Sequence, residues 1–409
     1  MKNTNLKDIF RSLNYRNYRL FFSGQFISLI GTWMQQIAMS WLVYRLTNSA
    51  FLLGAVGFVG QMPAFLMTPF AGVFADRWNR RKVLVITQTL AMIQALILAV
   101  LVLTHTVAVW QIVLLQVCLG LVNAFDIPVR QSFVVQMVEK KEDLGNAIAL
   151  NSSMVNGARL IGPSIAGVLI ATVGEGVCFL VNGLSYIAVI IALLAMKIPK
   201  INKASRTTKV LEELKGGFKY AFGHAQIRYV IVLLALVSLI GMPYAVLMPI
   251  FAREVLAGGP HTFGFLIGLS GVGALIGALY LASLKNAAGL EKVIVTGAAI
   301  FGTGLIAFSF SRVLWLSMIL MLFVGFGMMV QMAGSNTFLQ TIVHDDKRGR
   351  IMSFYTMAFM GMAPFGSLLA GWLASIMGAP KTIMAGGILC IVGALLFLRK
   401  LKVFKTVES

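Results

Sequence analysis

Long apolar segments alternate with short polar ones along most of the 409-residue chain. A helix needs about twenty apolar residues to cross the hydrocarbon core of a bilayer. Twelve segments meet that length, and they lie at residues 20–44, 51–74, 83–104, 109–135, 145–171, 177–196, 228–250, 262–284, 292–310, 314–336, 350–377 and 381–399. The pattern therefore predicts an all-helical integral membrane protein with twelve transmembrane helices.

One connection, at residues 197–227, is longer and more polar than the others and has six predicted spans on either side. Its residues 210–222 place apolar side chains at helical spacing beside charged ones, which is typical of a short helix lying on the membrane surface. We therefore divide the chain into an amino-terminal six-helix bundle at 1–196, a cytoplasmic linker at 197–227 and a carboxy-terminal six-helix bundle at 228–409.

The two halves of the chain repeat each other. Trp110 and Trp315, at an offset of 205, each open a span, and Gly120 and Gly325 follow ten residues later. A repeat of this length predicts two pseudo-symmetric bundles. Transporters built in this way bind their substrate at the interface between the repeats, near the bilayer midplane.

Basic residues gather on one side of the predicted membrane. With both termini inside, 29 of the 34 Lys and Arg residues fall on the cytoplasmic side, four fall outside and Arg159 lies within a span. Cytoplasmic loops carry such an excess, so we expect a multi-pass protein with both termini in the cytoplasm. This asymmetry explains the net charge of +20. Because the bases form no single patch or arm, no nucleic-acid partner is expected.

Composition and motifs give no support for an enzyme. Apolar residues make up 58% of the chain and charged residues 12%, against roughly 25% charged residues in soluble domains. The sequence shows no Ser/His/Asp order, zinc-ligand spacing or phosphate-binding loop, and its three cysteines lie within apolar segments. We expect no catalytic residues, no cofactor and no metal. Without a nucleotide-binding motif, any transport has to be driven by an ion gradient.

The loop between the second and third spans is unusually rich in charge. Its acid, Asp76, lies four residues after Gly72 and is followed by the bases Arg77, Arg80 and Arg81. Charge of this density is costly beside hydrocarbon, so the loop is expected on the cytoplasmic side. There it either latches helices together or only stops transfer of the chain.

The fifth span contains the pair Gly162 and Pro163, followed by Gly167. Proline weakens a helix within the membrane, although neighbouring helices can repair the loss, and small residues let two helices cross closely. A close helix crossing is one interpretation of these residues.

Asp126 in the fourth span and Arg159 in the fifth are charged residues within the membrane. Each costs about 2.5–3.5 kcal/mol at a helix centre on insertion scales, so both are expected to face a cavity or a partner. Arg130 follows Asp126 at a spacing that allows an ion pair on one helix face. These three residues are our candidates for proton coupling. A structural triad that locks the fourth and fifth spans together is the alternative.

Polar residues recur every three or four positions along the first span, which is otherwise apolar. Such a stripe faces water or protein rather than lipid, and packing against a neighbouring helix is the alternative to lining a cavity. In the tenth span, the repeat offset places Gln331 opposite Asp126. The polar positions singled out in these two spans are Gln25, Ser28, Thr32, Gln35, Gln36 and Gln331.

Four stretches together resemble one superfamily of transporters. They are residues 14–22 (NYRNYRLFF), the charged loop at 72–82, residues 126–131 (DIPVRQ) and residues 158–163 (ARLIGP). With them the chain resembles the major facilitator superfamily, and within it the branch that contains the bacterial enterobactin exporter and the macrolide efflux proteins. The resemblance covers nearly the whole chain.

The resemblance implies a fold of two six-helix bundles and roles for several residues. In the superfamily the charged loop gates transport, with the acid at the position of Asp76 bound to the start of a helix in the other half. The motif Gly-Pro-x-x-Gly-Gly marks exporters that exchange substrate for protons, and here Ala166 replaces the first glycine of its closing pair. In the superfamily spans 1, 4, 7 and 10 line the central cavity, so the resemblance implies a substrate cavity lined by Gln25, Ser28, Thr32, Gln35, Gln36 and Gln331. Gln116 stands where many proton-coupled relatives carry an arginine, which leaves Arg159 as the candidate substitute.

We therefore predict a secondary active transporter of the bacterial inner membrane, a monomer embedded in the lipid bilayer. It is expected to export a small amphipathic molecule, drug-like or siderophore-like, in exchange for protons or another coupling ion. An uptake carrier of the same fold, or a non-transporting membrane receptor, is the alternative.

Overall fold

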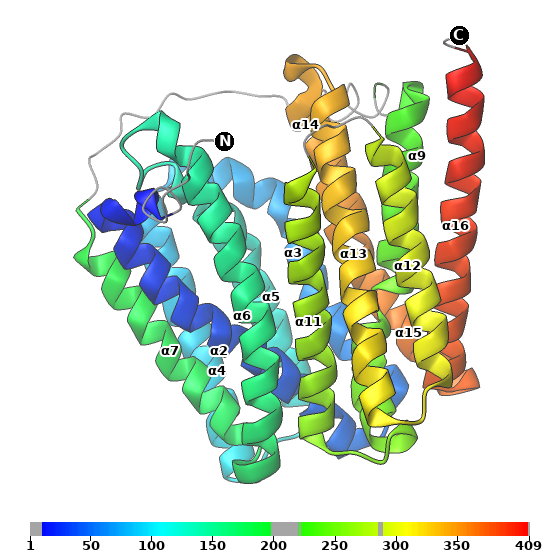
Figure 1. Cartoon of the computed structure of the whole chain (residues 1–409). Coiled ribbons are helices and arrows are strands. Elements are labelled where there is room, and N and C mark those ends of the chain that lie inside the picture. Colours follow the sequence, from blue (N-terminus) through cyan, green and yellow to red (C-terminus); the bar gives the residue numbers. More distant parts are fainter. Residues whose placement is uncertain (1–9, 198–219, 221, 285–288, 408–409) are drawn as a thin grey trace. The chain divides into compact units, whose positions relative to one another are not determined.

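The computed structural model describes residues 10–197, 220, 222–284 and 289–407 (Figure 1). The side chains of residues 68–77, 141, 345–346 and 401–407 lie outside the described part. The described residues form helices and connections without a strand, and twelve helices are long and apolar enough to cross a membrane. The prediction of twelve helical spans is confirmed.

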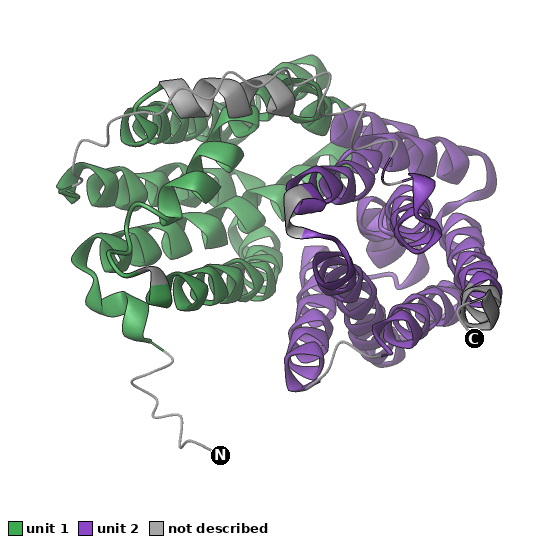
Figure 2. Cartoon of the chain, turned by 90° about the horizontal axis from the view of Figure 1, so that it is seen from above, with its two compact units in different colours: residues 1–46, 59–206 green, residues 47–58, 207–409 purple. Residues whose placement is uncertain are grey.

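The chain folds into two compact units (Figure 2). Unit 1 comprises residues 1–46 and 59–206, and unit 2 comprises residues 47–58 and 207–409. The sequence assigns residues 47–58 to the amino-terminal bundle, whereas in the structure they group with unit 2. Most of the predicted linker, residues 198–219 and 221, lies outside the described part, and with it the expected surface helix.

Close packing of α3 (Ala50–Arg77) on α15 (Met362–Met377) explains this grouping. A methyl group placed on Gly54 would overlap the Ser367 carbonyl oxygen and would lie 2.9 Å from Gly371 Cα. The rings of Phe58 and Phe365 meet edge to face with their centroids 5.9 Å apart. Helices in lipid associate through such close contacts, because lipid tails are as apolar as the side chains that they would replace.

Unit 1 is built around an apolar core that includes Tyr18, Phe21, Leu84 and Phe133, none of them more than 1% exposed. Short 3-10 turns lie at Arg11–Asn14 and Lys141–Asp143. Besides most of α3, the helices of unit 1 in the described residues are α2 (Arg16–Thr47), α4 (Arg80–Leu103), α5 (Val109–Val134), α6 (Leu144–Val173) and α7 (Glu175–Ala195).

Unit 2 has its own core, in which Phe251, Phe301 and Phe308 are fully buried. The stacked rings of Phe251 and Phe308 have centroids 4.2 Å apart. Besides the start of α3 and the whole of α15, its helices in the described residues are α9 (Ala225–Leu236), α10 (Tyr244–Ile250), α11 (Pro260–Ser283), α12 (Leu290–Phe310), α13 (Leu314–Ile342), α14 (Asp345–Met360) and α16 (Ala379–Val407).

Two of the predicted spans are not continuous α-helices. The seventh combines α9 and α10 with π-helical segments at Val237–Gly241 and Phe251–Val255, and the eleventh divides at Gly361 into α14 and α15. Pro249 and Pro364 lie close to these breaks. Proline has no N–H and its ring clashes with the carbonyl of the preceding turn, so regular helical hydrogen bonding is interrupted there.

The repeat glycines occupy matching helix crossings in the two units. A methyl group on Gly120 of α5 would overlap the carbonyl oxygen of Gly60 in α3. One on Gly325 of α13 would likewise overlap the carbonyl oxygen of Ser270 in α11. In each half, therefore, the fourth span crosses the second with the two backbones in contact.

We expect Gly325→Val to destabilise unit 2, because the added side chain has no room beside the Ser270 carbonyl and overpacking of a core costs about 1–3 kcal/mol. A lower melting temperature and less monodisperse protein in detergent would report the change. Gly349→Val is the matched control, since nothing lies within 4 Å of the position that a Cβ would take there. Equal stability of the two variants would show that the crossing of α11 and α13 is not needed.

Candidate functional site

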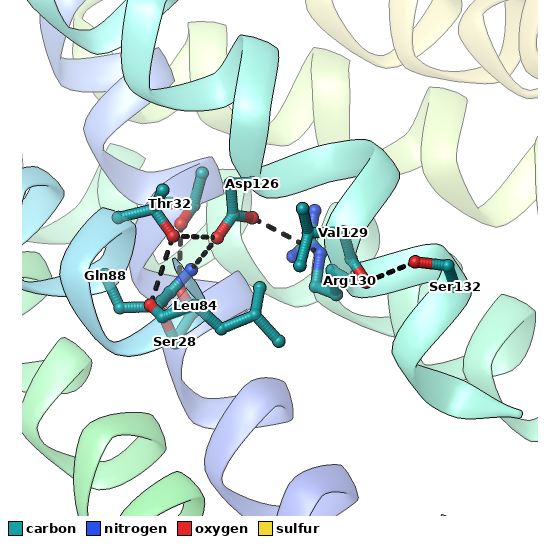
Figure 3. Close-up of polar contacts among 9 residues, drawn as sticks. Ser28, Thr32, Leu84, Gln88, Asp126, Val129, Arg130 and Ser132 are labelled. Atoms are coloured by element: carbon teal, nitrogen blue, oxygen red, sulfur yellow. Dashed lines mark hydrogen bonds and ion pairs between the residues drawn. The ribbon is translucent and has the colours of Figure 1, made fainter. Parts of the chain in front are cut away.

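Asp126 lies in α5 with its carboxylate turned toward α4, and the residue is 3% exposed (Figure 3). Its Oδ1 accepts hydrogen bonds from Thr87 Oγ1 at 2.9 Å and from Gln88 Nε2 at 2.7 Å. Hydrogen bonds to an ionised acceptor are about twice as strong as neutral ones. The two neutral donors of α4 therefore offset part of the cost of burying a charge among apolar helices.

Arg130, one turn further along α5, is the charged partner of Asp126. Its Nε lies 3.5 Å from Asp126 Oδ2, so the ion pair predicted from the spacing is present. The Arg130 side chain is 24% exposed, against 5% for the side chain of Asp126. Figure 3 shows Gln88 on one side of the carboxylate and Arg130 on the other. The two carboxylate oxygens thus have different surroundings, one neutral and one cationic.

Arg159 lies on α6, with its guanidinium carbon 5.5 Å from the centre of the Trp33 ring of α2. One turn later Gly162 brings α6 against α2, because a Cβ on Gly162 would lie 2.6 Å from Trp33 Cβ. Pro163 and Gly167 are also buried in α6. These contacts join the fifth span to the first, whereas the structural alternative drawn from the sequence joined it to the fourth.

The polar stripe of α2 divides into buried and exposed positions. Gln35 is 4% exposed, donates through Nε2 to Gln94 Oε1 of α4 at 3.0 Å and accepts at Oε1 from Asn182 Nδ2 of α7 at 2.7 Å. Thr32 and Gln36 are exposed. In this conformation Gln35 acts as a packing residue between three helices. Thr32 and Gln36 are accessible, and their place beside a cavity stays a prediction.

Three further candidates for the cavity are buried. Gln25 is 2% exposed, and Ser28 and Gln331 are fully buried. Ser28 Oγ and both amide atoms of Gln331 find no hydrogen-bond partner among the described residues. Side chains without exposed surface cannot touch a substrate in this conformation, so a contact remains a prediction for another arrangement of the helices.

The predicted gating motif lies where α3 ends and α4 begins. Gly72, Asp76 and Arg77 belong to α3, and their side chains lie outside the described part. Asn79 caps α4 by accepting a hydrogen bond from the backbone N–H of Lys82 at 3.1 Å. Such a cap satisfies one of the N–H groups that a helix start leaves without a partner.

The two remaining bases of the motif bind the ends of other helices in unit 1. Arg80 Nη1 donates to the Ser132 carbonyl at 3.5 Å, and Arg81 Nη2 donates to the Leu194 carbonyl. Ser132 and Leu194 lie in the last turns of α5 and α7, where carbonyl groups lack helical partners and the helix dipole favours a cation. Arg80 and Arg81 therefore hold helix ends together inside unit 1.

The NYRNYR stretch at the start of α2 docks on the connection between α5 and α6. Tyr15 Oη donates to Asp143 Oδ2 at 2.7 Å, and Arg11 Nε lies 2.9 Å from Asp143 Oδ1. The hydrogen bond to the Asp143 carboxylate raises the pKa of Tyr15. Deeper in the unit, Tyr18 Oη donates to the Ala147 carbonyl at 2.7 Å. These contacts therefore fasten the start of α2, with Arg11 just before it, to the start of α6 and the connection that precedes it.

The sequence of the chain matches a known protein family. Residues 9–409 match the family model MFS_3, which is described as transmembrane secretion effector. The chain belongs to this family of major facilitator transporters. This membership confirms the resemblance drawn from the sequence motifs and identifies the chain as a multi-pass transporter rather than an enzyme.

Individual members of the superfamily are similar to the chain over most of its length. The staphyloferrin A transporter of Staphylococcus aureus (strain NCTC 8325 / PS 47) is 28% identical over 390 residues, 94% of this chain and 97% of that protein. The multidrug efflux pump Tap of Mycolicibacterium fortuitum is 24% identical over 357 residues, 85% of this chain and 87% of that protein.

A solved structure shows the same fold. It is a bacterial homologue of the human lysosomal transporter Spinster in an inward-facing and unoccupied conformation. It matches with a TM-score of 0.75 at 14% identity and covers 94% of this chain and 96% of its own. The major facilitator fold predicted from the sequence is confirmed.

Within the part of the present chain that the structure describes, no group of three or more His, Cys, Asp or Glu side chains could hold a metal ion.

Sequence reasoning missed the uncharged partners in this transporter. Thr87, Gln88 and Gln94 of α4 and Asn182 of α7 were not singled out, although each is buried and hydrogen-bonded. The signal was available, because a polar side chain within an apolar span needs a partner. Polar residues also lie within the apolar third and sixth spans, and the same criterion marks them as residues that need a partner, although it does not say which partner each one binds.

Cysteine substitution separates the buried and exposed positions of α2. In a Cys118→Ala background we expect Thr32→Cys and Gln36→Cys to react with a water-soluble thiol reagent, and Gln35→Cys to stay unreactive because it is enclosed by two neighbouring helices. Ile27→Cys is the control for an exposed position among apolar residues, since Ile27 is 51% exposed on the same helix. We expect it to react more slowly than Thr32→Cys. Equal reaction rates at residues 27 and 32 would mean that the exposed polar positions face no separate aqueous cavity.

Proposed function

We propose that this transporter exports a small amphipathic molecule, drug-like or siderophore-like, by alternating access. The observation that carries the proposal is the family match over residues 9–409. A multidrug efflux pump and a staphyloferrin A transporter, both similar over most of the chain, support the class of substrate. The Gly162-Pro163 pair, which resembles the antiporter motif, favours export over uptake. We expect the single chain to be the working unit.

We further propose exchange for protons, with Asp126 as the group that binds the proton. In the described part of the chain two acidic side chains are buried, Asp126 and Glu175. Glu175 lies in the first turn of α7 and is paired with Arg45, Nε to Oε1, at 2.7 Å. Asp126 lies well inside α5. A carrier that neutralises a buried charge in each transport cycle can therefore use the Asp126 carboxylate to bind the proton. Arg130 and Arg159 are its proposed electrostatic controls.

We infer that both termini face the cytoplasm of a bacterial cell and that the protein resides in the inner membrane. The support is the distribution of Lys and Arg, with 29 of 34 on the side of the termini, since cytoplasmic loops carry this excess. Arg80 and Arg81 bind the ends of α5 and α7. With both termini in the cytoplasm, these contacts lie at the cytoplasmic end of unit 1.

Accumulation of candidate drugs and siderophores in cells with and without the protein tests the export proposal. We expect lower accumulation with the protein and loss of that difference when the proton gradient is collapsed. Higher accumulation with the protein would indicate uptake.

Two variants test the proposed proton site. Asp126→Asn should remove the pH dependence of export while substrate still binds. Arg159→Ala should move that dependence to higher pH, because an opposite charge favours the ionised carboxylate. An unchanged pH dependence in Asp126→Asn would place the proton elsewhere or point to another ion.

Asp76 is proposed to gate the cycle, because an acid within a basic loop adds nothing to topology, which the bases alone would set. We expect Asp76→Asn to lower the transport rate while membrane insertion and substrate binding stay at wild-type levels. Glu139→Gln is the matched control, since Glu139 is an exposed acid in another connection of unit 1. Wild-type transport by well-expressed Asp76→Asn would reject the gating role.

A further inference from the structure

The Thr87 hydroxyl faces two acceptors but has one hydrogen to donate. Its Oγ1 lies 2.9 Å from Asp126 Oδ1 and 3.1 Å from the carbonyl oxygen of Leu84. While Asp126 is ionised, the hydrogen satisfies the carboxylate. If a proton binds to Oδ1, the hydroxyl can turn to the Leu84 carbonyl and accept a hydrogen bond from the new O–H. Thr87 can therefore serve both forms of the acid without moving its backbone.

Gln88 offers a second adaptable contact. Its Nε2 donates to Asp126 Oδ1 at 2.7 Å, whereas its Oε1 is buried and has no hydrogen-bond partner among the described residues. A buried acceptor without a partner is a rare and costly feature of folded proteins. Rotation of the amide by half a turn would exchange the donor for this acceptor, which a protonated Asp126 would then satisfy.

The charges around Asp126 decide which oxygen takes the proton. Arg130 of α5 faces Oδ2, whereas the partners of Oδ1 among the described residues are the neutral donors Thr87 and Gln88. From α7 the buried Tyr186 is electrostatically coupled to both Asp126 and Arg130. From α6 the Arg159 guanidinium lies over the Trp33 ring of α2. A proton approaching Oδ2 would meet the Arg130 cation directly, so Oδ1 is the favoured atom.

We propose that Thr87 and Gln88 are positioning residues that let Asp126 alternate between its ionised and protonated forms at Oδ1. The inference rests on the proposed function, in which Asp126 binds the transported proton. In the step itself a hydronium ion gives its proton to Oδ1 and leaves as water. The new O–H donates a hydrogen bond to Thr87 Oγ1 or Gln88 Oε1, and the Thr87 hydroxyl, which keeps its hydrogen, donates to the Leu84 carbonyl instead. Arg130, partly exposed, is then left to interact with solvent.

The test is an infrared titration of the purified full-length protein in detergent, which needs no identified substrate. Subtraction of the Asp126→Asn spectrum from the wild-type spectrum separates the carbonyl stretch of protonated Asp126 from those of the other acidic residues, since the chain has 14 Asp and Glu in total. This difference band should grow as the pH falls. Thr87→Val and Gln88→Leu should each move the midpoint of this band to higher pH by about one unit, because they remove a donor from the ionised form. Thr87→Ser, which keeps the hydroxyl, should restore the wild-type midpoint.

Thr89→Val is the matched control on the same helix, since the Thr89 hydroxyl donates to the Val85 carbonyl at 2.7 Å and not to Asp126. A lower melting temperature in Thr87→Val and Gln88→Leu with an unmoved midpoint would reduce both residues to structural roles and overturn the inference. Gln88→Met serves in place of Gln88→Leu if that variant does not fold. Wild-type and Asp126→Asn spectra that show no difference band at any pH would overturn proton binding at Asp126, and with it the proposed coupling. A difference band for Asp126 together with unmoved midpoints in the Thr87 and Gln88 variants would reject the inference alone.

Discussion

Inside hydrocarbon a polar group has to find its partner within the protein, because neither water nor lipid offers one. The backbone meets this constraint by forming helices, and the buried side chains of unit 1 meet it across helices. Gln35 connects α2 to Gln94 and Asn182, and Asp126 connects α5 to two donors of α4. These bonds add to close backbone crossings such as that at Gly120. Together they replace the hydrophobic drive that a soluble bundle would use.

The two units share helix crossings but differ in their polar interiors. Where unit 1 has Asp126 and Arg130, the repeat places Gln331 and Ser335 in unit 2. Ser335 Oγ donates to the Gln331 carbonyl at 2.7 Å, and the Gln331 amide has no partner among the described residues. A repeat preserves the backbone geometry because the glycines at the crossings are kept, while the side chains on either side of them are free to differ. Charge chemistry is thus concentrated in one half.

Two bases of the loop between α3 and α4 have a structural role within unit 1. Arg80 and Arg81 reach the carbonyl ends of α5 and α7, where an arginine both donates hydrogen bonds and complements the helix dipole. Arg80 and Arg81 thus tie three helices of unit 1 together. A change in the spacing of those helix ends would therefore have to break or remake these contacts.

The number of spans, the repeat and the Asp126–Arg130 pair were predictable from the sequence, because each depends on length, periodicity or spacing along one helix. The partners Thr87 and Gln88, the burial of Gln35 and the grouping of residues 47–58 with unit 2 were decided only by the tertiary structure. These features depend on how each helix is turned about its axis and on which helices cross. An almost uniformly apolar helix carries little information about that rotation, since lipid and protein interior are equally apolar and only contacts between particular side chains distinguish one face from another.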